Sequence, residues 1–146
     1  ENITYSPSVE ISNCRFNAIP TRGILVTARG KIRIHDNEFT NVAMANVFIS
    51  NDANDWYESG PVRDVEIYNN KFIVTENNLP KFIDCSAILV QPITFGGKVT
   101  APVHKNIYVH SNYFDVRRDR VITAHGVENL RTEDNEYKNI STVKIN

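Results

Sequence analysis

One eight-residue pattern recurs five times along the 146-residue chain, and this repetition restricts the fold more than any other feature. In each copy two apolar residues alternate with polar ones, a polar pair follows, and an aromatic residue ends the pattern. The copies begin at positions 9, 32, 65, 107 and 130, which are 23, 33, 42 and 23 residues apart. Such alternation predicts a short strand with one buried face, and repetition of this kind is typical of solenoids.

We therefore predict an all-β fold, a right-handed parallel β-helix (a single-stranded solenoid) of about five coils with a 23-residue basic repeat. A second apolar segment follows at 23–26, 46–49, 87–90 and 120–123. Its offset from the repeat start places the extra residues of the longer intervals in insertions at 50–61, near 75–82 and at 91–102. Three alternatives are weaker: the spacing of leucine-rich repeats and the hexapeptide period of a left-handed β-helix are absent, and a β-sandwich would not have a 23-residue register.

Equivalent positions of successive coils are expected to lie one strand spacing apart, ~4.8 Å. This spacing predicts three stacks: an aromatic one of Phe16, Phe39, Phe72, Phe114 and Tyr137, an aliphatic one of Ile11, Ile34, Ile67 and Val109, and an amide ladder of Asn37, Asn70, Asn112 and Asn135 at the turn. Cys14 occupies the ladder position of the first copy, so we interpret it as a turn residue and not a nucleophile. Cys85 is interpreted as a buried thiol.

Composition limits the possible partners. The formal net charge is −1, so no overall field favours nucleic acid or an anionic membrane surface. No apolar run approaches the ~18–20 residues of a spanning helix, so we expect no membrane insertion. The chain begins with Glu1 and not Met, which indicates a processed secreted protein or an excerpt of a longer one. We expect one domain, 1–146, cut from a longer β-helix and secreted, periplasmic or on the cell surface; the oligomeric state stays open.

The two insertions at 50–61 and 91–102 point to a site. Both follow the second strand of neighbouring coils, so they are expected to emerge side by side and wall a cleft. The first contains the carboxylates Asp52, Asp55 and Glu58 with Asn54, Trp56 and Tyr57. Aromatic faces stack on sugar rings, and a carboxylate pair can supply the acid and base of glycoside cleavage. The alternative is ordinary turn chemistry, with Trp56 packed against the coil.

The second insertion has no carboxylate; Gln91 could bind a hydroxyl but cannot act as a base. His35 and His110 share an outward strand position and are interpreted as solvated, His104 as a cap or brace, and His125 as a turn residue. No metal-ligand spacing occurs, and we predict no metal and no other cofactor.

The segment from Asn51 to Gly60, together with 62–65, 69–72 and 103–107, resembles glycoside hydrolase family 110, the bacterial α-1,3-galactosidases with a β-helix fold. That resemblance implies hydrolysis of terminal α-linked galactose by an inverting, metal-independent mechanism, with a galactose-terminated glycan as the partner. It makes Asp52 the general acid, with Asp55 and Glu58 as other acidic members of the catalytic group. Asn54, Trp56, Tyr57 and Gln91 are the candidate substrate-binding residues.

The catalytic base is left open. The family has acidic residues after the third-coil strand, where this chain has Gln91-Pro92-Ile93-Thr94. Either Asp55 or Glu58 serves as the base, or the chain is a non-catalytic module that binds glycan or has a structural role. A calcium-dependent, pectate-lyase-like enzyme is the third alternative.

Overall fold

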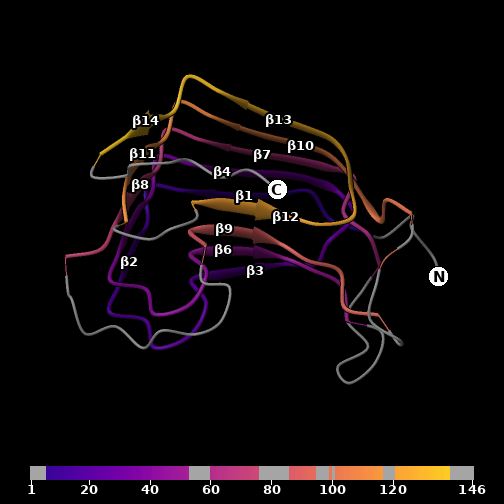
Figure 1. The fold of residues 1–146 in the computed structure, drawn as a ribbon, viewed down its shortest axis with the longest axis horizontal. Helices are drawn as coiled ribbons and strands as arrows, with labels where there is room; N and C mark the ends of the chain where they lie inside the picture. The colour runs from indigo at the N-terminus through magenta and orange to yellow at the C-terminus, as the bar shows by residue number, and fades with distance from the viewer. Residues whose placement is uncertain are drawn as a thin grey trace.

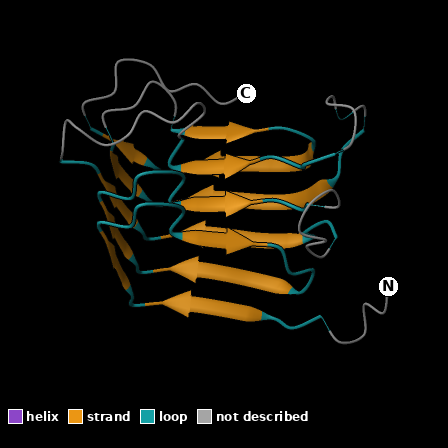
Figure 2. Ribbon diagram, turned by 90° about the horizontal axis from the view of Figure 1, so that it is seen from below, coloured by secondary structure: helices purple, strands orange, loops and turns teal. Residues whose placement is uncertain are grey.

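The computed structural model describes residues 6–52, 60–75, 86–94, 99, 101–116 and 121–138. Within these residues every regular element is a β-strand, and the strands form three parallel sheets, here named A, B and C. Neighbouring strands in each sheet come from successive copies of the repeat. Figure 1 shows the three sheets around a common interior, and Figure 2 shows their strands stacked in layers.

The bounds of the strands follow the repeat. Sheet A contains β1 (Val9–Ser12), β4 (Lys31–His35), β7 (Asp64–Tyr68), β10 (His104–His110) and β13 (Val127–Glu133). Sheet B contains β2 (Arg15–Asn17), β5 (Glu38–Thr40), β8 (Lys71–Ile73), β11 (Tyr113–Asp115) and β14 (Glu136–Tyr137). Sheet C contains β3 (Ile24–Val26), β6 (Val47–Ile49), β9 (Ile88–Val90) and β12 (Ile122–Ala124).

The core is built by stacking equivalent side chains. In sheet A, Ile34 pairs with Ile67, which pairs with Val109, and all three are fully buried. The predicted aromatic stack is confirmed: ring centroids from Phe16 to Phe39, Phe72, Phe114 and Tyr137 are 4.6, 5.0, 4.8 and 5.4 Å apart in turn. Each offset-stacked aromatic pair contributes ~0.5–1.5 kcal/mol beyond the burial of its area.

The turn from sheet A to sheet B, here named the A–B turn, carries the predicted amide ladder. The backbone N–H groups of Cys14, Asn37, Asn70 and Asn112 each donate to the side-chain Oδ1 of the next ladder asparagine, at 2.9–3.0 Å. The interpretation of Cys14 as a ladder residue is therefore confirmed. The strained backbone lies one residue earlier than the ladder, because φ is positive at Asn13, Asp36, Asn69, Ser111 and Asp134.

The connection from sheet C to the next strand of sheet A, here named the C–A corner, varies in length. It has 4 residues after β3, 14 after β6, 13 after β9 and 2 after β12. The alignment of Ile24, Val47, Ile88 and Ile122 in sheet C agrees with the sequence register, although β12 is shifted from the expected 120–123. The insertion near 75–82 and Cys85 fall almost wholly outside the described residues. The parallel all-β architecture is consistent with the predicted β-helix.

Candidate functional site

The two long corners begin side by side. Beyond the last residues of β6 and β9, parallel pairing continues as far as a bridge between Asp52 and Ile93. The Ile93 N–H donates to the Asn51 carbonyl at 3.0 Å, and the Gln91 N–H donates to the Ile49 carbonyl at 3.0 Å. The start of each insertion is therefore held at one strand spacing from the other.

Of the three predicted catalytic carboxylates, Asp52 lies within the residues that the structure describes. Its side chain is buried, with 4% of the residue exposed. A carboxylate in such a position costs free energy unless the surroundings stabilise it, and Asp52 does make a further interaction. The backbone bridge to Ile93 fixes where this side chain leaves the strand.

The remaining candidates divide into two groups. Gln91 is partly buried, and its backbone carbonyl accepts a hydrogen bond from the Ser50 hydroxyl at 2.9 Å. It thus lies beside the strand end from which Asp52 departs. The other candidates, Asn54, Asp55, Trp56, Tyr57 and Glu58, lie outside the described residues.

The closing end of the first insertion is packed against an arginine that the sequence reasoning missed. A Cβ on Gly60 would lie 2.1 Å from the Arg29 Nη2, so the guanidinium rests directly on the glycine backbone. Arg29 belongs to the short C–A corner after β3. The register in sheet A does not reveal this contact, because the pairing of Lys31 with Asp64 would align Arg29 with Val62 and not with Gly60.

His104, which the sequence analysis interpreted as a cap or brace, is the second residue that positions this corner. It is fully buried at the start of β10, and its Nδ1 accepts a hydrogen bond from the Val62 N–H at 3.3 Å. Burial, with a smaller contribution from the positive charge of Arg63, lowers the pKa of His104 from 6.5 to about 4. The ring is therefore neutral at pH 7, and because Nδ1 is an acceptor, the proton is assigned to Nε2.

This tautomer leaves a buried donor. The Nε2 of His104 has no hydrogen-bond partner within the described part of the chain. His104 follows the second insertion directly, and its ring accepts from Val62 just after the first, so it links the ends of both. Its own N–H donates to the carbonyl of Gly126, in the corner after β12, at 3.0 Å. The contact with Val62 agrees with a bracing role.

Gly126 also positions the second insertion. Its φ is +61°, and a Cβ there would lie 2.9 Å from Pro92 Cγ and 3.2 Å from Val99 Cγ1. Both the left-handed backbone and the close approach of the insertion favour glycine. The corner after β12 thus supplies a surface on which the preceding corner packs.

His125 lies in the two-residue corner after β12, as expected for a turn residue, and its N–H donates to the Val90 carbonyl at 2.9 Å, whereas His35 and His110 lie away from this corner. His35 and His110 flank Tyr68 in one outward column of sheet A, with ring centroids 4.6 and 5.2 Å from it. Hydrogen bonds to Asp36 and Glu10 raise the pKa of His35. The shared outward position is confirmed, but both side chains are paired and partly buried, with 13% and 20% exposure, so they are less solvated than expected.

No group of three or more His, Cys, Asp or Glu side chains in the described ranges is arranged to hold a metal ion. Over the same ranges, no helix is long and apolar enough to cross a membrane. The structure thus defines a stack of parallel sheets with polar insertions at one corner, and a buried carboxylate where they begin.

Comparison with known proteins specifies the relationship further. No protein-family profile matches the chain. Curated α-1,3-galactosidases do match it: α-1,3-galactosidase A of Peterkaempfera griseoplana is 37% identical over 145 residues, covering 99% of this chain and 19% of that protein. The A enzyme of Streptomyces avermitilis is 43% identical over 128 residues, covering 87% and 19%. The B enzyme of Bacteroides thetaiotaomicron is 36% identical over 137 residues, covering 92% and 22%.

These matches confirm the resemblance to bacterial α-1,3-galactosidases that the sequence suggested. Nearly the whole chain matches one segment of those proteins. The chain is therefore related to a segment of glycoside hydrolases, and its own structure is rich in parallel β-sheet. The chain spans about a fifth of the length of the relatives it matches.

Proposed function

We propose that this chain is part of a glycoside hydrolase that releases terminal α-linked galactose from a glycan by an inverting, metal-independent mechanism. The observation that carries the proposal is the similarity of almost the entire chain to α-1,3-galactosidases, at 32–43% identity. The buried Asp52 at the paired start of both insertions supports it. Galactose-terminated glycans are typical of cell surfaces and secretions, so we propose a secreted, periplasmic or cell-surface location.

In this proposal Asp52 is the general acid that protonates the leaving oxygen. An inverting enzyme needs a second carboxylate ~6.5–9.5 Å away, with space for the attacking water. Asp55 or Glu58 supplies that base, and Asn54, Trp56, Tyr57 and Gln91 bind the sugar. The bridge between Asp52 and Ile93 supports a shared cleft, because it holds the first residues of both insertions at one edge.

The proposed scaffold is a right-handed parallel β-helix of five coils, and the whole chain is one domain excerpted from a longer β-helix. The order of strands supports this arrangement, since five successive coils each contribute one strand to sheets A and B, and the first four each contribute one to sheet C. The insertions 50–61 and 91–102 then project from one corner and form the sugar cleft.

A non-catalytic role in glycan binding or structural support is the second candidate. One observation favours it: Asp52 is paired with Ile93, and the described residues around that partner, Gln91, Pro92 and Thr94, carry no carboxylate. In that case the corner would bind galactose without an acid–base pair.

Incubation with an α-1,3-galactosyl disaccharide tests the proposal. We expect galactose release by the chain, inversion at the anomeric carbon by NMR, and a loss of kcat of at least ~10²-fold in Asp52→Asn, because a positioned acid contributes ~10²–10⁴-fold. Asp134→Asn is the matched control, since Asp134 is an exposed turn residue and asparagine tolerates its positive φ. Sugar binding without turnover would replace the hydrolase with the binding module.

A further inference from the structure

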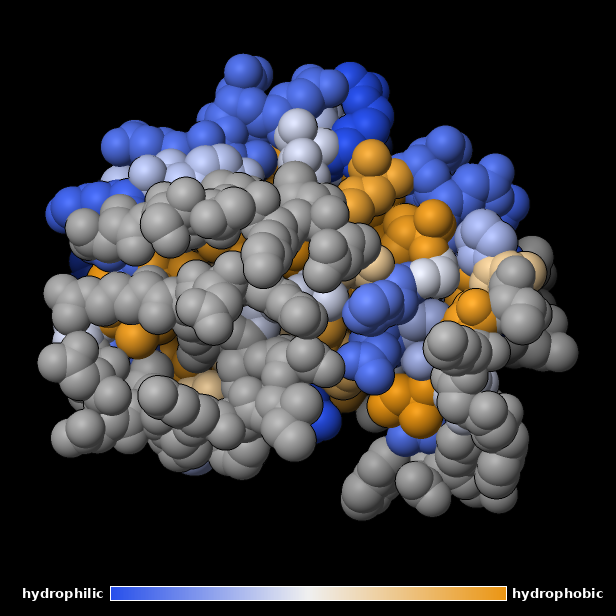
Figure 3. Space-filling view, viewed as in Figure 1, coloured by the Kyte–Doolittle hydropathy of each residue, from blue (hydrophilic) through white to orange (hydrophobic). Residues whose placement is uncertain are grey.

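The outer face of sheet A carries a hollow of about 290 Å³. Its walls come from β4, β7, β10 and β13 and include Arg33, Glu66, Asn106, Tyr108, Asn129 and Arg131. Figure 3 shows hydrophilic residues along the edge of the molecule where sheet A lies in Figure 1. Its volume lies just below the ~300 Å³ at which small-molecule sites begin, so the hollow can accept one sugar unit at most.

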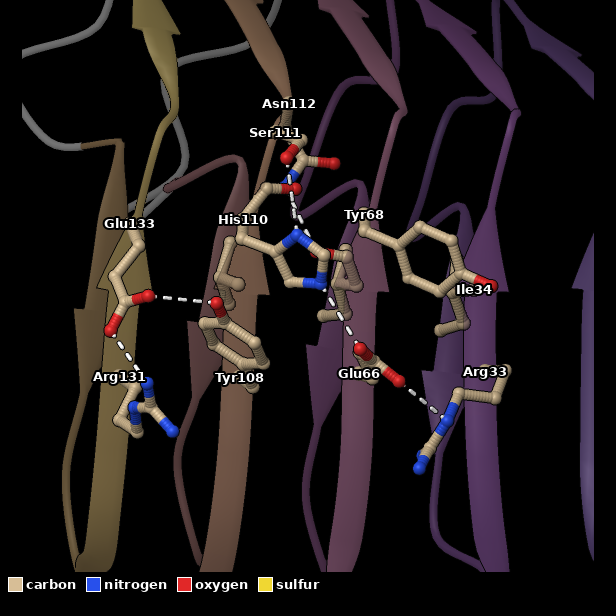
Figure 4. Close-up of polar contacts among 12 residues, drawn as sticks. Arg33, Ile34, Glu66, Tyr68, Tyr108, His110, Ser111, Asn112, Arg131 and Glu133 are labelled. Atoms are coloured by element: carbon tan, nitrogen blue, oxygen red, sulfur yellow. Dashed lines mark hydrogen bonds and ion pairs between the residues drawn. The ribbon is translucent and has the colours of Figure 1, made fainter.

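The walls are held in place by their own contacts, several of which Figure 4 shows. The Arg33 Nε lies 2.7 Å from a Glu66 carboxylate oxygen, and its Nη1 lies 2.9 Å from Asp64. On the other side, the Tyr108 hydroxyl and the Arg131 guanidinium each donate to Glu133 at 2.8 Å. Side chains fixed in this way lose little conformational entropy when a ligand binds.

Charged groups of both signs and a neutral phenol line the hollow. Arg33, Glu66, Tyr108 and Arg131 occupy equivalent positions of four successive strands, so a cation, an anion, a neutral phenol and a cation follow one another. Each charge already has a partner of opposite sign within hydrogen-bonding distance. The hollow therefore attracts neither a free anion nor a free cation, and it favours a neutral ligand.

The polar groups also restrict the chemistry of that ligand. Guanidinium groups only donate hydrogen bonds and carboxylates only accept them, while the amides of Asn106 and Asn129 do both. A sugar hydroxyl donates and accepts at one atom, so a polyhydroxylated ring can use all of these groups. The Tyr108 ring is not an open stacking platform, because the Arg131 Cζ lies 4.8 Å from its centroid.

We propose that this hollow is an accessory subsite for a neutral sugar unit of a glycan, distinct from the corner that contains Asp52. The choice of a galactose-containing ligand rests on the proposed function; the neutral-sugar chemistry of the hollow does not. The binding is weak, because the site is shallow and its groups satisfy one another in the free protein.

Titration of the ¹⁵N-labelled chain with α-1,3-linked galactobiose tests the subsite by NMR. We expect shift changes at the amides of Arg33, Glu66, Tyr108 and Arg131. Asn129→Gly should weaken this binding by about fivefold or more, the effect of losing one hydrogen bond. Glycine accommodates the φ of +62° at that position. Asn13→Gly is the matched control, since Asn13 is also exposed with a positive φ, of +56°, and lies outside the hollow.

Two further arms separate this proposal from the galactosidase assignment. In Asp52→Asn the shifts at the hollow should persist, whether or not the chain releases galactose. Galacturonic acid should bind the hollow more weakly than galactose, because the site provides no unpaired cation. The proposal is overturned if galactobiose causes no shifts at the hollow, or if Asn129→Gly and Asn13→Gly bind it with equal affinity. It is also overturned if the shifts are lost in Asp52→Asn, or if galacturonic acid binds as tightly as galactose or more tightly.

Discussion

The A–B turn and the C–A corner are two ways of linking the same sheets, and they differ in how completely their polar groups are satisfied. In the A–B turn a polar residue with positive φ is followed by the ladder residue in every coil, and Asn37, Asn70 and Asn112 each bond to a ladder neighbour on both sides. In the C–A corner the length ranges from 2 to 14 residues. Among the described residues of that corner, the Asn51 Oδ1 and, where the second insertion enters β10, the His104 Nε2 are buried without a hydrogen-bond partner.

This difference suggests separate roles for the two connections: the A–B turn stabilises the stack, and the C–A corner is the candidate functional region. Repetition allows each turn to complete the hydrogen bonds of the next, so the ladder stabilises the stack. The corner interrupts that repetition and leaves polar groups available in a buried setting. Buried polar groups without partners are costly, and functional or strained sites are where such departures are expected.

The largest expected effect is on the ladder itself. Asn70→Ala removes an amide that accepts from the Asn37 backbone at 3.0 Å and donates to the Ile34 carbonyl at 2.9 Å, both in the interior. The change leaves several buried groups unsatisfied, so we expect a loss of about 3–5 kcal/mol in the free energy of unfolding. Urea denaturation measures this loss.

Asn69→Gly is the control for that measurement. Asn69 is exposed and has a φ of +54°, which glycine adopts without strain, so the free energy of unfolding should change by less than ~1 kcal/mol. If the two variants were equally stable, the ladder would not be the element that stabilises the turns.

The next effect concerns pH dependence at the corner. The folded pKa of His104, about 4, lies below its unfolded value of 6.5, so the unfolded chain binds the proton first as the pH falls. The stability from the neutral ring is complete above pH 6.5 and is lost progressively towards pH 4. Between pH 6.5 and pH 5 this amounts to about 2 kcal/mol.

Comparison of His104→Gln with the unchanged chain by urea denaturation at pH 7 and pH 5 isolates this contribution. The variant should lose less stability on acidification, because glutamine does not titrate. His35→Gln is the opposite case: the pKa of His35 is raised, so its contribution is present at low pH and is lost as the pH rises. An unchanged pH dependence in His104→Gln would contradict the assignment of a buried neutral ring.

The sequence predicted the parts of the molecule that obey the repeat. The stack from Phe16 to Tyr137 and the amide ladder follow from translation of one coil onto the next, so the spacing of the pattern was enough to find them. His104 could not be found in this way, because it aligns with Val62 and Val127, which share no chemistry with it. Arg29 likewise contacts Gly60 across a corner whose length differs between coils.

The hollow on sheet A is an intermediate case. Its residues occupy repeated outward positions, so their alignment was available from the register. Their function was not, because outward polar residues on a sheet are usually only solvated. The three-dimensional contacts of Arg33 with Glu66, and of Arg131 with Tyr108, distinguish fixed walls from a solvated row.

The smallest effect is expected from a substitution that extends the amide ladder by one residue, at Cys14. Cys14 already receives the ladder bond, since its N–H donates to Asn37 Oδ1 at 2.9 Å, but its thiol contacts only the Ser12 carbonyl, at 3.2 Å, among the hydrogen bonds described for it. In Cys14→Asn the new amide can donate to that same carbonyl and to Asn37 Oδ1, as Asn70 does with Tyr68 and Asn112. We expect a gain of ~0.5–1 kcal/mol in the free energy of unfolding, at the low end for a hydrogen bond because Cys14 is exposed. Cys14→Ser is the control: its hydroxyl retains the bond to Ser12 but cannot reach the ladder, so a gain as large as that of asparagine would show that removal of the thiol, and not the ladder geometry, stabilises this turn.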